Sequence, residues 1–210
     1  MNISKSDIVF DKEYTNSYRD KYNEQCQCRE CTLFRSQFSE NYPGAASFLS
    51  DFGVNVDYPL EIMDNGIDDG DWKRRYYVYY CMKGELPCDK IEDNIGGIPV
   101  TLRNWNIANE AYANTSMAKP YFIIELGEIS INDNRGLLSY ALEMGREIEF
   151  HYKNKNYFIS RKNANDWYLY CEQTKGTQTF SSSEDLLNKA TLDNTNINNV
   201  FDEVVVDYIL

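Results

Sequence analysis

The sequence contains a single histidine, His151, among its 210 residues, and it lacks most patterns that mark catalysis. A Cys-His or Ser-His pair would have to use His151, which alternation along a strand points away from the apolar side of Phe150. The Gly96-Gly97 pair lacks the lysine and the following helix of a phosphate-binding loop. We therefore assign no catalytic residue, and the balance favours a protein that is not an enzyme.

Membrane and nucleic-acid signals are also missing. No stretch approaches 18 consecutive apolar residues, so no membrane-spanning segment is expected. Residues 1–7 lack the apolar stretch of a signal peptide, which makes the cytoplasm the expected location. The 21 basic residues are scattered along the chain and form no basic cluster, so no nucleic acid is expected as a partner.

Acidic residues and tyrosines, by contrast, are plentiful. The 33 Asp and Glu residues give a net charge of −12, and 17 tyrosines contribute to an aromatic content of 14%. Such a charge repels nucleic acids and anionic membranes and attracts basic proteins, while tyrosine suits interaction surfaces. We therefore expect an acidic, non-enzymatic binding protein with a basic protein partner, for example an immunity protein that neutralises a basic toxin. Solubility alone is the alternative reason for the charge, and the oligomeric state is not indicated.

Three of the six cysteines lie within six residues, at Cys26, Cys28 and Cys31. Cytoplasmic cysteines are more often reduced thiols or metal ligands than disulfides, and thiolates this close in sequence suit Zn²⁺. A structural zinc site needs a fourth ligand, and we predict Cys88, ahead of Cys81, because it lies in a loop. Ordinary reduced thiols without a cofactor are the alternative.

Residues 1–133 are predicted to form a cysteine-containing α+β domain, with a helical cap on a mainly antiparallel sheet. Three helices are expected before Gly53, and the third begins at Pro43, which suits a first helical position. The alternation and composition then predict strands over residues 58–63, 76–81, 100–105 and 121–129. A helical turn or two is expected at residues 107–112.

A predicted contact surface combines the tyrosine-rich strand with an acidic loop at residues 64–71. That loop does not match the spacing of a calcium-binding EF-hand, and we interpret it as a solvated hairpin loop. The tyrosines of one strand face could contact a partner beside it. The predicted surface residues are Tyr77, Tyr79, Asp68, Asp69 and Asp71.

A carboxylate-based hydrolase is the alternative function. Glu110 follows a strand and an Asn- and Trp-containing segment, and Glu125 lies in the next strand. Glycoside hydrolases place a pair of carboxylates in this way beside an aromatic platform. This hypothesis requires both carboxylates to converge in one pocket.

Residues 134–210 are predicted to form a separate, small α-β-β-β-α-β module, so that the whole chain is α+β. Its strongest patterns are the alternating strand 147–152, a helix that begins near Ser183, and the apolar ending 204–210. With these stretches the last third of the chain resembles a small uncharacterised bacterial domain. The resemblance implies a bacterial origin and a separate module, but no activity.

Overall fold

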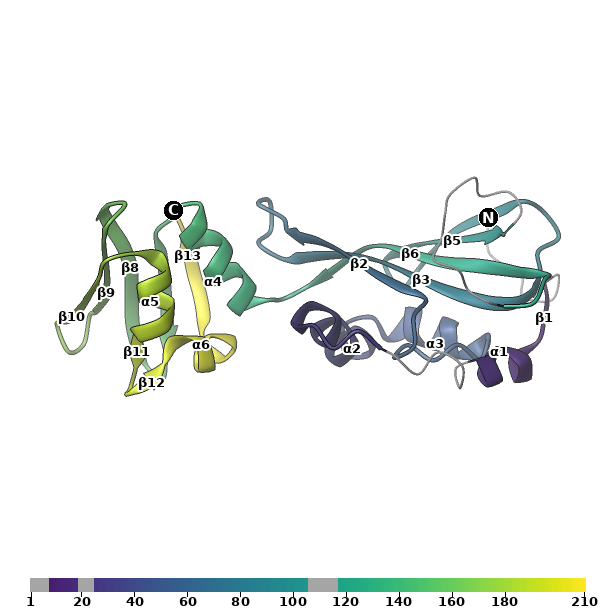
Figure 1. Ribbon diagram of the computed structural model, residues 1–210, viewed down its shortest axis with the longest axis horizontal. Coiled ribbons are helices and arrows are strands. Elements are labelled where there is room, and N and C mark those ends of the chain that lie inside the picture. The colour runs from purple at the N-terminus through teal and green to yellow at the C-terminus, as the bar shows by residue number, and fades with distance from the viewer. Residues whose placement is uncertain (1–7, 19–24, 106–116) are drawn as a thin grey trace. The chain divides into compact units, whose positions relative to one another are not determined.

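The structure is a computed structural model that describes residues 8–18, 25–105 and 117–210 (Figure 1). The chain divides into two compact units. The first comprises the described residues up to Asp68 together with Arg74–Ile131, and the second comprises Asp69–Lys73 and Asn132–Leu210. The division after Ile131 lies two residues before the predicted boundary. The structure confirms the predicted α+β class with mainly antiparallel sheets.

In the described part of the chain, no helix has both the length and the apolar character needed to cross a membrane.

The first unit is built on an antiparallel sheet whose longest strands are β3 and β6. Its strand order is β1-β3-β6-β5-β4, and β2 pairs with β3 off this path. The strands are β1 (Val9–Phe10), β2 (Glu61–Ile67), β3 (Arg74–Glu85), β4 (Lys90–Ile95), β5 (Ile98–Asn104) and β6 (Tyr121–Ile131).

Three helices form the predicted cap on one face of this sheet (Figure 1). They are α1 (Lys12–Tyr18), α2 (Arg29–Asn41) and α3 (Pro43–Asp51). Pro43 occupies the first turn of α3, where its missing N–H is not needed. Gly53 follows the helix with a φ of +76°, a conformation that favours glycine, so α3 ends where the sequence predicted.

The tyrosine-rich strand β3 directs alternate side chains into the core between sheet and helices. Tyr76 and Tyr80 are fully buried there, against residues such as Phe34 of α2. Each buried hydroxyl has a partner: Tyr76 donates to the carbonyl of Glu30, and Tyr80 donates to that of Val56, both at 3.0 Å. Burial of these rings is therefore not opposed by an unpaired polar group.

Two features of this sheet differ from the sequence prediction. Residues 64–67, expected in a loop, belong to β2, because the carboxylate of Asp64 receives two hydrogen bonds from Arg74 on β3, at 2.6 and 2.8 Å. β4 was not predicted, because its charged residues interrupt the apolar pattern. It pairs with β5 through a tight turn in which Gly96 and Gly97 both have positive φ.

The second unit has a five-stranded antiparallel sheet of order β10-β9-β8-β7-β13, with helices on one of its faces (Figure 1). A small hairpin, β11 (Thr191–Leu192) and β12 (Thr195–Asn196), lies outside that sheet. The remaining elements are α4 (Asn134–Glu143), β7 (Ile148–Tyr152), β8 (Lys155–Asn163), β9 (Asp166–Cys171), β10 (Gly176–Phe180), α5 (Ser183–Lys189), α6 (Ile197–Val200), η3 (Phe201–Glu203) and β13 (Val205–Ile209).

Local signals explain most of these elements. Asp133 and Ser182 cap α4 and α5, with side-chain oxygens that accept amide hydrogen bonds at 2.8 and 3.0 Å. Lys153 and Asn154 form the turn between β7 and β8, both with positive φ. β10 is an addition to the predicted order of elements, since its sequence is polar and, among the described strands, it pairs with β9 alone.

Candidate functional site

The clearest chemical feature of the first unit is the three-thiol cluster, which we define as Cys26, Cys28 and Cys31. Their sulfur atoms all lie within 4.8 Å of one another. Cys26 and Cys28 are exposed, whereas Cys31 is buried in the first turn of α2. The sequence prediction that these three cysteines lie together is therefore realised in the fold.

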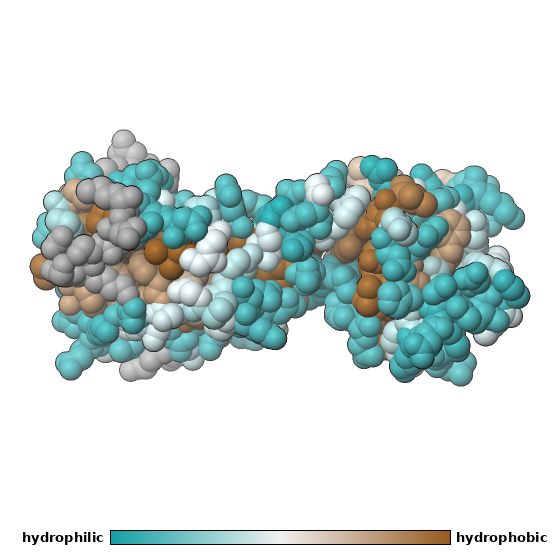
Figure 2. Space-filling view, turned by 180° about the vertical axis from the view of Figure 1, so that it is seen from behind, coloured by the Kyte–Doolittle hydropathy of each residue, from teal (hydrophilic) through white to brown (hydrophobic). Residues whose placement is uncertain are grey.

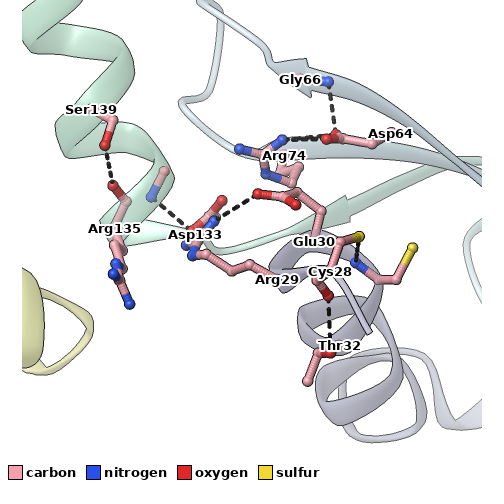
Figure 3. Close-up of polar contacts among 12 residues, drawn as sticks. Cys28, Arg29, Glu30, Thr32, Asp64, Gly66, Arg74, Asp133, Arg135 and Ser139 are labelled. Atoms are coloured by element: carbon pink, nitrogen blue, oxygen red, sulfur yellow. Dashed lines mark hydrogen bonds and ion pairs between the residues drawn. The ribbon is translucent and has the colours of Figure 1, made fainter. Parts of the chain in front are cut away.

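The start of α2 holds Cys28 and Cys31 together. Cys28 is the N-cap residue, with extended backbone angles, and its sulfur accepts a hydrogen bond from the amide of Cys31 at 3.4 Å (Figure 3). Thr32 then donates its hydroxyl to the Cys28 carbonyl at 3.0 Å (Figure 3). The side chain of an N-cap residue lies close to the backbone amide three residues later, so the short spacing from Cys28 to Cys31 is enough to produce this contact.

Two side-chain hydrogen bonds anchor the segment before the helix to other parts of the unit. Arg35 donates from Nη2 to the carbonyl of Cys26 at 2.6 Å, across two turns of α2. Gln25 donates to the carbonyl of Asp57, also at 2.6 Å. These bonds keep Cys26 beside the helix start, within reach of the other two thiols.

The thiols of Cys26 and Cys31 have unequal acidities. The backbone amide and thiol of Cys28, followed by the thiol of Cys31 and the charge of Arg35, lower the pKa of Cys26 below its usual value. Burial raises the pKa of Cys31 to about 12, and the hydrogen bonds and charges of its two neighbours act in the same direction. Cys26 is therefore the more readily ionised of the two.

Three converging sulfur atoms could hold a metal ion, because thiolates are soft ligands that favour ions such as Zn²⁺ or Cu⁺. Cys88, the predicted fourth ligand, lies outside this group, in the loop between β3 and β4, and its thiol donates to the carbonyl of Lys90 at 3.4 Å. Within the described residues, no other His, Cys, Asp or Glu belongs to the group. The structure thus assembles three of the four predicted ligands.

A cavity of about 330 Å³ lies beside the three-thiol cluster. Both Cys26 and Cys31 line it, and so does Cys81 on β3, whose sulfur lies 3.4 Å from that of Met117. The sequence could not predict this cavity, because its walls come from α1, α2, β2, β3 and the segments that precede α2 and β2. The other lining residues are Thr15, Gln25, Arg35, Gly53, Val54, Asn55, Tyr58, Pro59, Leu60, Glu61, Ile62 and Tyr80.

The predicted contact surface is divided between the units. Tyr77, Tyr79 and Asp68 belong to the first unit, and Asp69 and Asp71 to the second. Both tyrosines are half-buried, and Tyr79 packs on a small apolar cluster that includes Cys81. Asp68 forms an ion pair with Arg75, at 3.4 Å, and Asp69 accepts a hydrogen bond from Tyr140. The side chains of this predicted surface are therefore partly engaged within the protein itself, which leaves less of them to contact a partner than the sequence indicated.

The alternative catalytic pair receives no new support. Glu110 lies outside the described residues. Glu125 is half-buried on β6 and lies 3.6 Å from Nη2 of Arg103 on β5. A carboxylate in this position has a structural explanation as an ion-pair partner, and the hydrolase hypothesis stays a prediction.

Sequence reasoning missed a second candidate surface, the open sheet face. We define it as the side of the five-stranded sheet opposite the helices, represented by Glu149, His151, Phe158, Tyr170 and Asp207. A groove of about 590 Å³ runs over it. His151 Nδ1 lies 3.1 Å from both carboxylate oxygens of Asp207, which joins β7 to β13. In the sequence, this surface could have been indicated only by the alternate strand residues that point away from the core.

The edge of the open sheet face carries further acidic and apolar groups. Glu172 lines the groove on one side, and Tyr208, which is 64% exposed, lines it on the other. Val205 is also exposed on β13. Lys175 is the one lysine or arginine in the described lining. Figure 2, which views the chain from behind, shows the second unit with a band of hydrophobic residues among hydrophilic ones.

Comparisons of this chain with models of known protein families, with curated proteins and with solved structures found no match. The resemblance of the C-terminal third to a small bacterial domain therefore stays a prediction, and function has to be argued from the two sites themselves.

Proposed function

We propose that this chain is a non-enzymatic, cytoplasmic binding protein of bacterial origin that engages a basic protein partner through the open sheet face. A bacterial immunity protein that covers the positive surface of a toxin is the biological form that fits this proposal best. The observation that carries the proposal is the groove, which three carboxylates line together with the half-buried Phe158 and Tyr170 and the exposed Tyr208.

The composition of the open sheet face supports a basic partner. Glu149, Glu172 and Asp207 bring negative charge, against which Lys175 is the lining lysine, and His151 is engaged with Asp207. The net charge of −12 adds long-range attraction, which speeds association with a positively charged protein. Lysine and arginine side chains could pair with these carboxylates.

The aromatic side chains supply the contact area that carboxylates alone do not. Phe158 and Tyr170 lie on adjacent strands, opposite one another in the β8–β9 register, and both line the groove. Tyr208 extends the same surface at the edge strand. Aromatic groups at the centre of an interface contribute area with little loss of side-chain freedom, and they also stack with arginine and lysine.

Charge reversal on the open sheet face tests this proposal. We expect the triple variant Glu149→Lys, Glu172→Lys, Asp207→Lys to bind the partner at least about tenfold more weakly, because like charges then oppose one another across the interface. The control, Glu143→Lys, Glu184→Lys, Glu203→Lys, changes exposed carboxylates of the same unit that do not line the groove, and it has the same net charge.

Tagged forms of the native chain and of both variants serve as baits for proteins of the source cells, and affinities are then measured by calorimetry at two salt concentrations. A basic protein retained by the native chain and the control, but released by the face variant, supports the proposal. The same three chains, co-expressed with any captured toxin, are compared for protection of growth. Equal binding by both variants, or the absence of any basic partner, would contradict it.

For the three-thiol cluster we propose Zn²⁺ as the bound ion. Support comes from the donor set, since three thiolates within 4.8 Å of one another match the soft, tetrahedral preference of zinc. Such an ion would tie the segment before α2 to the first turn of that helix. Binding is also expected to be weaker in acid, because ligand thiols must lose their protons.

Elemental mass spectrometry of tag-free protein tests the zinc site. We expect about one zinc per native chain, and none in the triple variant Cys26→Ser, Cys28→Ser, Cys31→Ser, because serine hydroxyls are poor zinc ligands. Cys171→Ser is the matched control, since Cys171 belongs to the second unit and is not a member of the cluster, and it should leave the zinc content unchanged. Equal metal content in native and triple-variant protein would refute the site.

A further inference from the structure

The three-thiol cluster borders a cavity. The fourth coordination position of a metal ion bound by the cluster could therefore lie on the cavity side. Cys26 and Cys31 both contribute to the cavity wall, so the cluster borders this space. A tetrahedral ion held by three protein ligands keeps one position for another group. In structural sites a fourth side chain closes that position, whereas open sites leave it to an exogenous ligand.

Neither remaining cysteine of the first unit closes the site in the structure. Cys88 is exposed in the β3–β4 loop and is not a member of the cluster. Cys81 lines the same cavity but also lies outside the cluster, and its sulfur is packed against Met117 at 3.4 Å. Cys81 is fixed within the central strand β3, so it cannot approach without displacing that strand.

The cavity has the size and chemistry of a small-molecule site. Its volume of about 330 Å³ lies at the lower end of the range for ligand pockets. Leu60 and Val54 give it apolar walls, Asn55 adds a polar group, and Arg35 and Glu61 bring one positive and one negative charge. A compact molecule with an apolar body and a polar end fits these walls.

We propose that the metal site of the three-thiol cluster is open, and that its fourth position binds the thiol of a small exogenous molecule seated in the cavity. This inference rests on the metal site proposed above. A thiol is the preferred donor because a centre with three thiolates is soft and discriminates against oxygen ligands. On binding, the thiol releases its proton to solvent and displaces one metal-bound water, so no oxidant is needed.

Cobalt substitution with 2-mercaptoethanol as the probe tests the proposal. Protein loaded with Co²⁺, in a buffer with a phosphine reductant and no thiol, is examined by X-ray absorption and visible spectroscopy. We expect three sulfur neighbours and one oxygen neighbour before addition, and four sulfur neighbours after a saturable titration. The Cys81→Ser variant is expected to behave like the native chain.

Two tryptophan variants separate binding in the cavity from binding at an exposed metal. Leu60→Trp places a large side chain in the cavity wall and is expected to weaken 2-mercaptoethanol binding at least tenfold, with Co²⁺ still bound. Met63→Trp lies on the adjoining strand, 43% exposed and outside the cavity, and should leave the titration unchanged. An equal response of both variants would contradict the proposed position of the thiol.

The outcomes distinguish this inference from the metal proposal beneath it. Failure of native protein to bind Co²⁺ or Zn²⁺ would overturn the metal site and, with it, the open position. Four sulfur neighbours before any thiol is added would leave the metal site intact but show it closed from within. Loss of the fourth sulfur in Cys81→Ser would then identify Cys81 as the internal ligand. A spectrum that keeps three sulfur neighbours after 2-mercaptoethanol is added would also overturn the open-site proposal.

Discussion

Replacement of Phe150 by alanine is expected to lower the free energy of unfolding of the second unit by about 3–5 kcal/mol. Phe150 is 1% exposed at the centre of that core. Its ring stacks on Tyr157 with a centroid distance of 5.3 Å and meets Phe201 edge-on at 5.2 Å. The expected loss of stability is the sum of two parts: the burial free energy of the removed aromatic ring, and the cost of the cavity left between Tyr157 and Phe201.

The size of this effect is large relative to the stability of a domain, which is about 5–15 kcal/mol. Hydrogen exchange followed by mass spectrometry measures it segment by segment. Protection should fall throughout β7, β8 and β9, while β3 and β6 stay protected, because the two large cores have no residue in common. A matched control is Phe158→Ala, on the open sheet face of the adjacent strand, with an expected loss of about 1 kcal/mol. Equal losses at the two positions would show that the faces are wrongly assigned.

The second large effect is expected in the alkylation of metal-free protein by iodoacetamide. At pH 7 Cys26 should react at least about 30-fold faster than Cys31, because thiolate is the reactive form. The pKa of Cys26 is lowered by hydrogen bonds from Cys28, whereas burial raises that of Cys31 to about 12. Because the pKa of Cys26 lies below the ordinary thiol value of 9.0, the thiolate fractions differ by at least about a thousandfold. The greater intrinsic reactivity of the more basic thiolate reduces this difference to a rate ratio of at least about 30-fold.

The pH dependence has a defined sign. The alkylation rate of Cys26 should rise with pH and level off once the thiolate dominates, whereas that of Cys31 should continue to rise about tenfold per pH unit up to pH 12. Trypsin cleaves after Arg29 and so places Cys31 on a different peptide from Cys26 and Cys28, which share one peptide and are distinguished by fragmentation in the mass spectrometer. Cys28→Ala removes a side-chain donor and should slow Cys26. Comparable rates for Cys26 and Cys31 in the native chain would refute these assignments.

Much of the backbone could be predicted from the sequence because its signals are local. Pro43 begins α3 and Gly53 follows it, since each has a conformational preference that needs no distant partner. The alternation of residues 148–152 predicted β7, and the caps of α4 and α5 are side chains close to the amides that they bind. The proximity of the three thiols is local too, because it follows from the helix start at Cys28.

The strand segments that the sequence did not predict depend on distant partners instead. β4 and β10 carry polar or charged sequences and are strands because β5 and β9 supply their hydrogen-bond partners. Residues 64–67 were predicted to be a loop from composition, but pairing with β3 and the contact from Arg74 extend β2 through them. Strand propensity depends on such neighbours, which a local pattern does not contain.

The sequence by itself determined the α+β class, the acidic surface charge and the local cluster of three thiols, because composition, periodicity and short spacings are properties of the chain alone. Only the tertiary structure decided that Cys88 lies outside the cluster and that a cavity adjoins it. It also decided which face of the second sheet the helices cover and which face carries a groove. Strand alternation defines two faces, but packing between segments distant in sequence selects the one that is buried.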